Sequence, residues 1–476
     1  MSTTVNTLGG GSTEVADEAL EELRGTVGGE VLTPADSDYG TVRAAANAMH
    51  AATPGLVVRC SGTADVVQAV TFARAQGLAV TVRGGGHSVA GLSSTDGGML
   101  IDLSPMRAVM VDPERRLAYV QGGALWADVD REAQAFGLVT PGGVVSDTGV
   151  AGLTLGGGYG WVRRMYGLSC DNLVEAQVVG ADGQVRTASA DTNPDLYWAL
   201  RGGGGNFGIV TSFTFRLHPL GPIVAFAGVF YPLEDAPQVL RNWRAFVANT
   251  SDEVSSAMVV LSFPVDPHVP PPVQGRTCVV AGAVFAGDVE EGLQALAPLG
   301  QLGTPIFDLT SPMPFTFVQS AFDALTPRGE FRQYWKSQYL DALGDDALDA
   351  FADLAGDRPA PLVLMNIWQL GGAIARVGPE ETAFAERSAS FMVSIDGNWQ
   401  EPAADAEVIG WVRAAWRRIG EFGNGSTYLN FTGLADEAAD TGVDTALGRN
   451  LARLSRVKTA YDPDNFFRRN NNIRPA

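Results

Sequence analysis

Three glycine clusters in the first half of the chain restrict what it can fold into. They lie at Gly84–Gly86, Gly156–Gly160 and Gly202–Gly208. A run of glycines lets successive backbone N–H groups point at an anion and lets a ligand approach the chain closely. Glycine accounts for 57 of the 476 residues, about 12% against a typical ~7%. Because the glycines are clustered, they indicate a binding function rather than linkers.

The third cluster contains a formal G-x-G-x-x-G motif at Gly203, Gly205 and Gly208. In a dinucleotide-binding βαβ unit, this motif follows a strand and opens a helix. Here it follows an expected helix over residues 195–200 and opens an expected strand over residues 209–217. This order of elements excludes a Rossmann-type site.

Composition narrows the classes of partner. The chain has 33 Lys and Arg against 53 Asp and Glu, a formal net charge of −20. We expect no nucleic-acid partner and no membrane-surface partner, because nucleic acids and anionic membranes both attract clustered positive charge. We also expect no membrane span, because no apolar run approaches the ~18 residues that a span needs.

The first 23 residues contain no Lys or Arg, so we expect no secretory signal and a cytoplasmic location. The three cysteines are too few and too scattered for a disulfide framework or a zinc site.

The sequence divides into four expected segments of an α+β protein. Residues 1–34 hold a Ser/Thr/Gly-rich stretch, expected to be flexible and frayed, and a first helix near residues 14–23. Residues 35–220 carry the glycine clusters, residues 221–425 begin Pro-rich and then become rich in aromatic residues, and residues 426–476 regain a polar signature. We read the second and third segments as separate domains.

His87 is the most informative of the four histidines, because it follows the first glycine cluster and a strand of buried type. An unperturbed imidazole has a pKa of ~6.5 and is mostly neutral at pH 7. His87 is therefore a candidate nucleophile, base or metal ligand. We expect no metal, because no second ligand lies near it at the usual spacing.

Several long motifs, in the right order, resemble the berberine bridge enzyme-like FAD-linked oxidases of the vanillyl-alcohol-oxidase-type (PCMH-type) FAD fold. The motifs are Val80–Gly91, Leu155–Gly160, Tyr166–Leu168 with Asp171–Asn172, Arg201–Gly208, and the tail segments Tyr461–Phe467 and Asn472–Ile473. The resemblance covers roughly residues 35–220 and 425–476. It implies a two-subdomain FAD-binding domain, a substrate domain with an antiparallel sheet covered by helices, and a C-terminal segment that returns to the FAD domain.

The resemblance also implies how FAD is held. His87 matches the residue that is bonded covalently to the flavin 8α-methyl group. Many relatives carry a second link from a cysteine, and Val145 holds that position here. Cys170 does not match it, so we expect one covalent link only, as in the singly His-linked members of the family. The residues implied to bind the cofactor are Arg83, Gly84, Gly85, Gly86, His87, Ser88, Gly91, Val145, Thr148, Gly149, Gly152, Gly158, Tyr159, Gly160, Gly208, Ile209, Val210, Asn430, Asn470 and Asn472.

Flavin chemistry needs a group that takes the substrate proton during hydride transfer. Tyr428 and Asn430 match a Tyr-x-Asn motif that the family places over the flavin, and Gln369 precedes a Leu-Gly-Gly segment where relatives often carry a polar residue. Tyr428 and Gln369 are thus the candidate catalytic residues. Free tyrosine has a pKa of ~10, so Tyr428 needs a lowered pKa or a concerted transfer to act as the base. The aromatic residues Tyr334, Trp335 and Trp368 are candidates for a pocket or for the core.

The implied activity is an FAD-dependent oxidase. It would take a hydride from a small alcohol, amine or alkaloid-like molecule and pass electrons to O₂, giving H₂O₂. A dehydrogenase with a non-oxygen acceptor remains an alternative, as does an oxidative or non-redox cyclase of secondary metabolism on the same fold. The sequence leaves the oligomeric state open.

Overall fold

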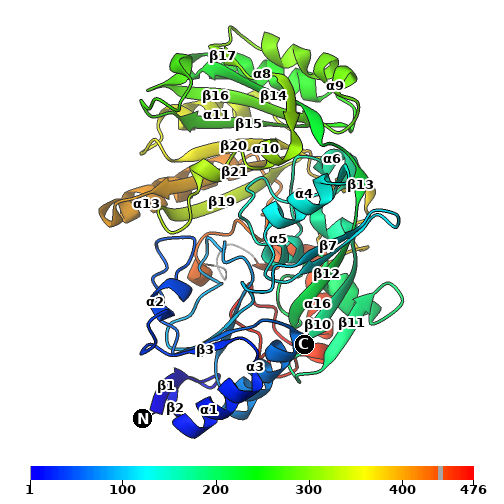
Figure 1. Cartoon of the computed structure of the whole chain (residues 1–476). Coiled ribbons are helices and arrows are strands. Elements are labelled where there is room, and N and C mark those ends of the chain that lie inside the picture. The colour runs from blue at the N-terminus through cyan, green and yellow to red at the C-terminus, as the bar shows by residue number, and fades with distance from the viewer. Residues whose placement is uncertain (1, 438–442) are drawn as a thin grey trace.

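A computed structural model describes residues 2–437 and 443–476 of the chain. Two lobes lie one above the other in Figure 1, and the fold combines helices with mainly antiparallel sheets. The first lobe contains a four-stranded and a five-stranded sheet, and the second lobe contains an eight-stranded sheet. The α+β class expected from the sequence is confirmed.

The four-stranded sheet carries the chain into the first glycine cluster. Its order is β3-β4-β6-β5, and β4, β6 and β5 are parallel. Parallel strands are covered on both faces and read as continuous apolar runs, which explains the Leu-Val-Val and Met-Leu-Ile sequences of β4 and β6. The bounds are β3 Glu30–Leu32, β4 Leu56–Arg59, α3 Thr63–Ala75, β5 Val80–Arg83 and β6 Met99–Asp102.

The five-stranded sheet has the order β11-β10-β12-β8-β7 and is antiparallel throughout. The third glycine cluster joins helix α7 to strand β12, as the sequence predicted. The bounds are β7 Val109–Asp112, β8 Leu117–Gln121, α4 Trp126–Gln134, α5 Val150–Leu155, β10 Leu173–Val179, β11 Val185–Ser189, α7 Pro194–Leu200 and β12 Ile209–Arg216.

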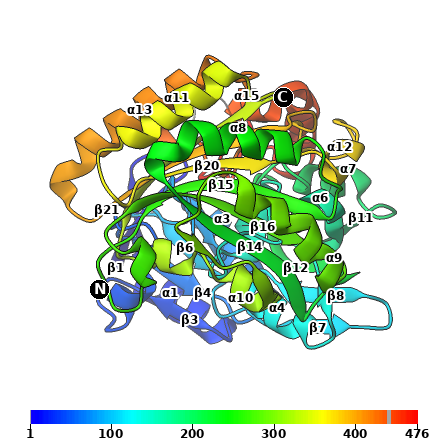
Figure 2. The ribbon, with the colours of Figure 1, turned by 90° about the horizontal axis from the view of Figure 1, so that it is seen from above.

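The eight-stranded sheet is antiparallel, with the order β17-β14-β16-β15-β20-β21-β19 and β18 paired to β14. Figure 2 shows α8, α9, α11 and α13 lying over one face, where they pack on the sheet in the largest apolar core. The other face is turned toward the first lobe. The bounds are β14 Ile223–Pro232, α8 Ala236–Val247, β15 Val254–Ser262, β16 Thr277–Phe285, α9 Val289–Leu296, β17 Phe307–Asp308, β18 Ser311–Pro314, β19 Arg332–Leu340, α11 Asp345–Gly356, β20 Leu364–Gln369, β21 Phe391–Trp399 and α13 Asp405–Gly420.

The chain crosses between the lobes twice. The first crossing lies between β13 (His218–Pro219) and β14, which belong to different sheets. After α13 the chain returns to the first lobe, where α16 (Leu451–Tyr461) packs beside α7. Inside the first lobe, the Lys458 ammonium is fully buried and donates to the Asp462 carboxylate and to the carbonyls of Asn206 and Phe467.

The first residues form ordered strands rather than the frayed stretch expected from composition. Strands β1 (Ser2–Asn6) and β2 (Ser12–Ala16) make an antiparallel hairpin. Val5 and Val15 are fully buried in the core of the first lobe, and glycines with positive φ form the turn. The Ser/Thr/Gly composition therefore reflects a two-stranded hairpin. The helix expected from residue 14 begins at Asp17, as α1 (Asp17–Thr26).

Among the described residues, no helix is long and apolar enough to cross a membrane.

Candidate active site

A large cavity lies where the two lobes meet, and residues far apart in the sequence line it. The first lobe contributes glycine loops, and the second lobe contributes the cavity-facing side of its sheet. Sixteen of the predicted site residues line it: Gly84, Gly85, Gly86, His87, Ser88, Val145, Thr148, Gly149, Gly152, Tyr159, Gly208, Ile209, Val210, Tyr428, Asn430 and Asn470. The structure thus brings the three glycine clusters and the C-terminal motif to one site.

The first glycine loop is held against a second loop by direct backbone packing. A Cβ built on Gly85 would lie 2.3 Å from the Cα of Gly149, and one built on Gly149 would lie 2.5 Å from the nitrogen of Gly85. Gly86 has φ +73°, a conformation that side chains rarely adopt. Loops 84–88 and 145–149 therefore need glycine to approach each other, and they form one rigid edge of the cavity.

His87 lies in the wall, with its side chain 12% exposed. Its Nε2 atom is 3.5 Å from Oδ1 of Asp147, and its ring centroid is 6.1 Å from that of Trp335. Burial lowers the pKa of His87, while the negative charge of Asp147 acts in the opposite direction. The imidazole is therefore neutral near pH 7, as a nucleophilic or accepting nitrogen requires.

The geometry of the glycine loops fits a flavin nucleotide. Gly152 and Gly205 line the cavity, and a Cβ on either would meet no atom within 4 Å, so a side chain there would take up space inside it. Asn470 also lines the cavity, and its Oδ1 atom is buried with no hydrogen-bond partner. Open space beside glycine backbone and an unpaired buried acceptor are features that a polar nucleotide can fill.

The Tyr-x-Asn motif lies at the same cavity, in a segment outside the strands. The Tyr428 hydroxyl oxygen accepts hydrogen bonds from Nδ2 of Asn430 at 2.9 Å and from the backbone N–H of Gly158 at 3.1 Å. Tyr159 packs edge-on against Tyr428, with ring centroids 4.8 Å apart. Burial raises the pKa of Tyr428, outweighing the two hydrogen bonds, which act to lower it. Tyr428 therefore stays protonated at neutral pH.

Asp396 is a wall residue that the sequence reasoning missed. Its Oδ2 atom accepts from Nδ2 of Asn366 at 2.7 Å and from the hydroxyl of Ser394 at 3.3 Å. Its Oδ1 atom is buried and has no hydrogen-bond partner. Burial raises the pKa of Asp396 from 3.8 to about 7, although both hydrogen bonds act to lower it. A carboxyl that titrates near neutrality in a cavity is a candidate general base.

The signal for Asp396 was present in the sequence. Asp396 is the single charged residue of the nine-residue strand β21, and alternation places it on the same face as Met392 and Ser394. On neighbouring β20, Leu364, Asn366 and Trp368 alternate in the same way, and all three line the cavity. The lone acid could therefore be read from the sequence, but which face of its strand looks toward the cavity could not.

Gln369 lies outside the cavity, contrary to the prediction. Alternation along β20 turns Trp368 toward the cavity and Gln369 toward the helix-covered face. There its side-chain amide donates to the carbonyl of Val247 and the hydroxyl of Thr250 and accepts from the backbone of Ser256. Of the aromatic candidates, Trp335 and Trp368 line the cavity, whereas the Tyr334 hydroxyl donates to Glu437.

Five predicted cofactor-binding residues support the wall from behind rather than lining it: Arg83, Gly91, Gly158, Gly160 and Asn472. The Arg83 guanidinium donates to the carbonyls of Val42, Arg43 and Ser93. A Cβ on Gly160 would lie 2.6 Å from the carbonyl oxygen of Gly142. Arg83 and Gly160 therefore shape the loops and do not line the cavity.

No cysteine lines the cavity among the described wall residues. Cys60, Cys170 and Cys278 are all free and buried elsewhere, and Val145 lines the wall.

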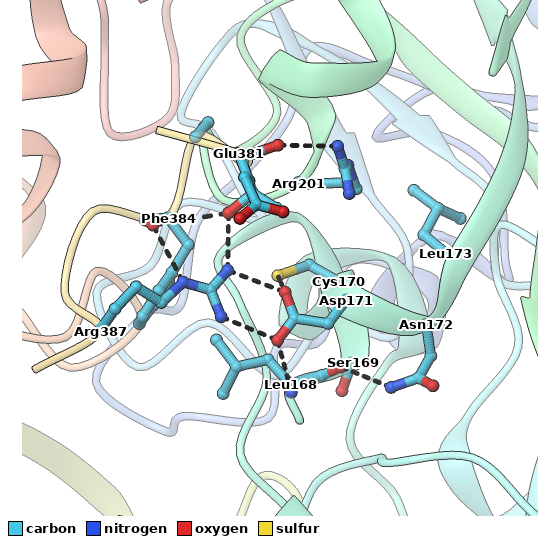
Figure 3. Close-up of polar contacts among 12 residues, drawn as sticks. Leu168, Ser169, Cys170, Asp171, Asn172, Leu173, Arg201, Glu381, Phe384 and Arg387 are labelled. Atoms are coloured by element: carbon cyan, nitrogen blue, oxygen red, sulfur yellow. Dashed lines mark hydrogen bonds and ion pairs between the residues drawn. The ribbon is translucent and has the colours of Figure 1, made fainter. Parts of the chain in front are cut away.

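Cys170 lies beside Asp171, in the network of Figure 3. There the Arg387 guanidinium from the second lobe donates to both carboxylate oxygens of Asp171 at 2.8 Å. This buried bidentate ion pair joins the two lobes beside the site.

Comparisons with known proteins agree with this arrangement. A family model described as an FAD binding domain matches residues 54–189, and a model described as berberine and berberine like matches residues 427–474. The two matches cover the first two glycine clusters and the returning C-terminal segment. The chain is 32% identical over 457 residues to the uncharacterized FAD-linked oxidoreductase YgaK of Bacillus subtilis (strain 168), covering 94% of this chain and 97% of that protein.

Two further comparisons extend over nearly the whole chain. The (R)-6-hydroxynicotine oxidase of Paenarthrobacter nicotinovorans is 28% identical, covering 94% of this chain and 97% of that protein. The crystal structure of 6-hydroxy-D-nicotine oxidase from Arthrobacter nicotinovorans superposes with a TM-score of 0.83 at 27% identity, covering 94% of this chain and 98% of that one. The chain is an enzyme of the berberine bridge enzyme-like family of FAD-linked oxidoreductases.

Proposed function

We propose that the protein is an oxidase that holds FAD covalently through His87 and oxidises a small aromatic alcohol or amine with O₂. The single observation that carries this proposal is the pairing of two groups across one cavity. His87 lies on the glycine-loop side, and the Asp396 carboxyl lies on the sheet side. Bound flavin supplies the hydride acceptor, and the residues of the chain supply position and proton transfer.

Asp396 is the proposed proton acceptor. Asn366 and Ser394 hold its Oδ2 atom, and its Oδ1 atom has no hydrogen-bond partner in the chain. A substrate O–H or N–H group that donates to Oδ1 loses its proton there as its carbon is oxidised. The efficiency of a base is greatest when its pKa lies near the working pH, which favours Asp396 over Tyr428.

Tyr428 has a different proposed role. Its oxygen already accepts two hydrogen bonds, so its hydroxyl proton is free to point at a ligand. A neutral phenol that donates a hydrogen bond can orient the substrate heteroatom. The Tyr-x-Asn motif then positions the substrate, and the proton leaves toward the opposite wall.

The wall of the sheet lobe favours an apolar, aromatic substrate. Its large side chains are Phe322, Trp335, Leu364, Trp368, Met392 and Phe431. A sugar carries many hydroxyl groups that each need a partner when buried, whereas this wall offers few polar side chains. A single carboxyl among aromatic rings suits a molecule with one amine or hydroxyl group, and one relative is named as an oxidase of 6-hydroxynicotine.

An anaerobic substrate screen tests the proposal. Purified enzyme is mixed without O₂ with aromatic alcohols, cyclic amines and sugars, and loss of the oxidised flavin absorption is followed. We expect bleaching by an aromatic alcohol or amine, and rapid recovery with formation of H₂O₂ on admission of air. Recovery over minutes would instead indicate a dehydrogenase with another acceptor, and product formation without bleaching would indicate a non-redox cyclase.

The covalent bond has a separate test. We expect acid-precipitated wild-type protein to remain yellow and His87→Ala to release its flavin into the supernatant. Colour retained by the precipitated variant would show that another residue carries the link.

A further inference from the structure

Asp147 lies directly opposite His87, on the second of the two loops that pack together. Its Oδ1 atom is 3.5 Å from Nε2 of His87, is buried, and has no hydrogen-bond partner. The two loops meet in a close backbone contact between Gly85 and Gly149, which brings His87 and Asp147 near each other. A buried carboxylate oxygen without a hydrogen-bond partner destabilises the fold. A hydrogen bond from the facing imidazole nitrogen would remove this cost.

The neighbouring charges hold Asp147 in this position. The Arg328 guanidinium donates to the carbonyls of Gly85 and Asp147, and it lies 3.7 Å from Oδ2 of Asp147. On the other side of this loop, the Asp323 carboxylate accepts from the backbone N–H and the hydroxyl of Ser146. Arg328 thus holds Oδ2 of Asp147, Asp323 holds the neighbouring Ser146, and Oδ1 faces Nε2 of His87.

A histidine that attacks a carbon atom must be neutral, and one of its nitrogens must keep a lone pair. Burial keeps His87 neutral by lowering its pKa. A carboxylate beside one ring nitrogen places the proton on that nitrogen and fixes the tautomer. A proton held on Nε2 by Asp147 leaves the second ring nitrogen as the one able to attack.

We propose that Asp147 is a positioning residue for the covalent attachment of FAD to His87, an inference that rests on the proposed function. In this step a C–H bond of the 8α-methyl group breaks, its proton is released to solvent, its electron pair passes to the flavin ring, and a bond forms between that carbon and the imidazole nitrogen. The Nε2 proton passes to Asp147, and two electrons remain on the flavin. O₂ removes these electrons as H₂O₂, which restores oxidised, tethered FAD.

The test separates binding of FAD from attachment of FAD. Asp147→Asn, Asp147→Glu, His87→Ala and the control Glu330→Gln are purified, and total flavin is compared with the flavin that survives acid precipitation. Glu330 is an exposed acid close to Arg328 in sequence. Glu330→Gln therefore removes one negative charge, as Asp147→Asn does, without removing the carboxylate that faces His87. Aerobic incubation with added FAD then gives the rate of covalent attachment.

We expect Asp147→Asn to bind FAD without covalent attachment for far longer than wild type, with the attachment rate reduced about tenfold or more. Asp147→Glu should recover part of the rate, because it restores a carboxylate, and Glu330→Gln should match wild type. A wild-type attachment rate in Asp147→Asn would overturn the inference, as would loss of all FAD binding, which would show a general role in the loop. Acid-labile flavin in the wild type would instead overturn the covalent link itself.

Discussion

Asp396 and Tyr428 face the same cavity but differ in which form is stable at pH 7. Burial raises the pKa of both groups, to about 7 for the carboxyl and further above neutrality for the phenol. An acid is a base only when ionised, and the ionised fraction of Asp396 grows as the pH rises through about 7. At pH 7 the carboxyl is therefore the group able to accept a proton.

We predict that kcat/KM of the wild type rises with pH up to an apparent pKa near 7 and is level above it. Asp396→Asn should lower kcat/KM by about 10²–10⁴-fold and remove the rise, because its amide does not titrate. Steady-state rates from pH 5 to 9 with one substrate, together with total flavin content, give the comparison. An unchanged pH profile in Asp396→Asn would assign the base elsewhere.

For Tyr428, the phenylalanine variant removes the hydroxyl but leaves the ring that packs on Tyr159. A lost hydrogen bond from a neutral donor costs about 0.5–1.5 kcal/mol, so we expect kcat/KM to fall about 2- to 12-fold while the apparent pKa near 7 remains. A loss as large as that of Asp396→Asn, with a changed pH profile, would restore Tyr428 as the base. Wild-type turnover would remove it from the mechanism.

At the scale of elements, the glycine loops were predictable because their chemistry is local. Gly85 and Gly149 must lack a side chain for their two loops to pack together. Glycine at these positions can be read directly from the sequence. Asp396 and Gln369 depend on which face of a strand looks inward, and that face is fixed by the sheet order β15-β20-β21-β19. The strand order is a long-range property, which is why Gln369 was preferred and Asp396 was missed.

Helix α16 gives a prediction at this same scale. The buried Lys458 ammonium links α16 to the third glycine cluster and to the C-terminal tail. It donates hydrogen bonds to Asn206, Asp462 and Phe467. Lys458→Met leaves the Asp462 carboxylate buried without its cation, which costs about 3–5 kcal/mol. Urea unfolding should show this loss, whereas exposed Arg456→Met on the same helix should change stability by less than about 0.5 kcal/mol. Equal effects would show that the ammonium adds nothing specific.

At the scale of the whole molecule, the cavity is where the two lobes meet, and its walls come from both. The glycine loops belong to the first lobe, and Trp335, Trp368 and Asp396 belong to the second. The lobes are also joined by the Arg387–Asp171 ion pair and by the returning chain. A cofactor that fills this cavity contacts both lobes, so it should couple their unfolding.

We therefore predict that FAD raises the unfolding temperature of both lobes together. In the His87→Ala variant, FAD is removable, and re-addition at ~100 times its Kd should stabilise the folded state by about 2.7 kcal/mol. Thermal unfolding should be followed by tryptophan fluorescence and by circular dichroism at several FAD concentrations. One transition that moves upward as FAD is added, in both signals alike, is the expected result. Two separate transitions, of which FAD moved only one, would show that FAD stabilises one lobe alone and would contradict the prediction.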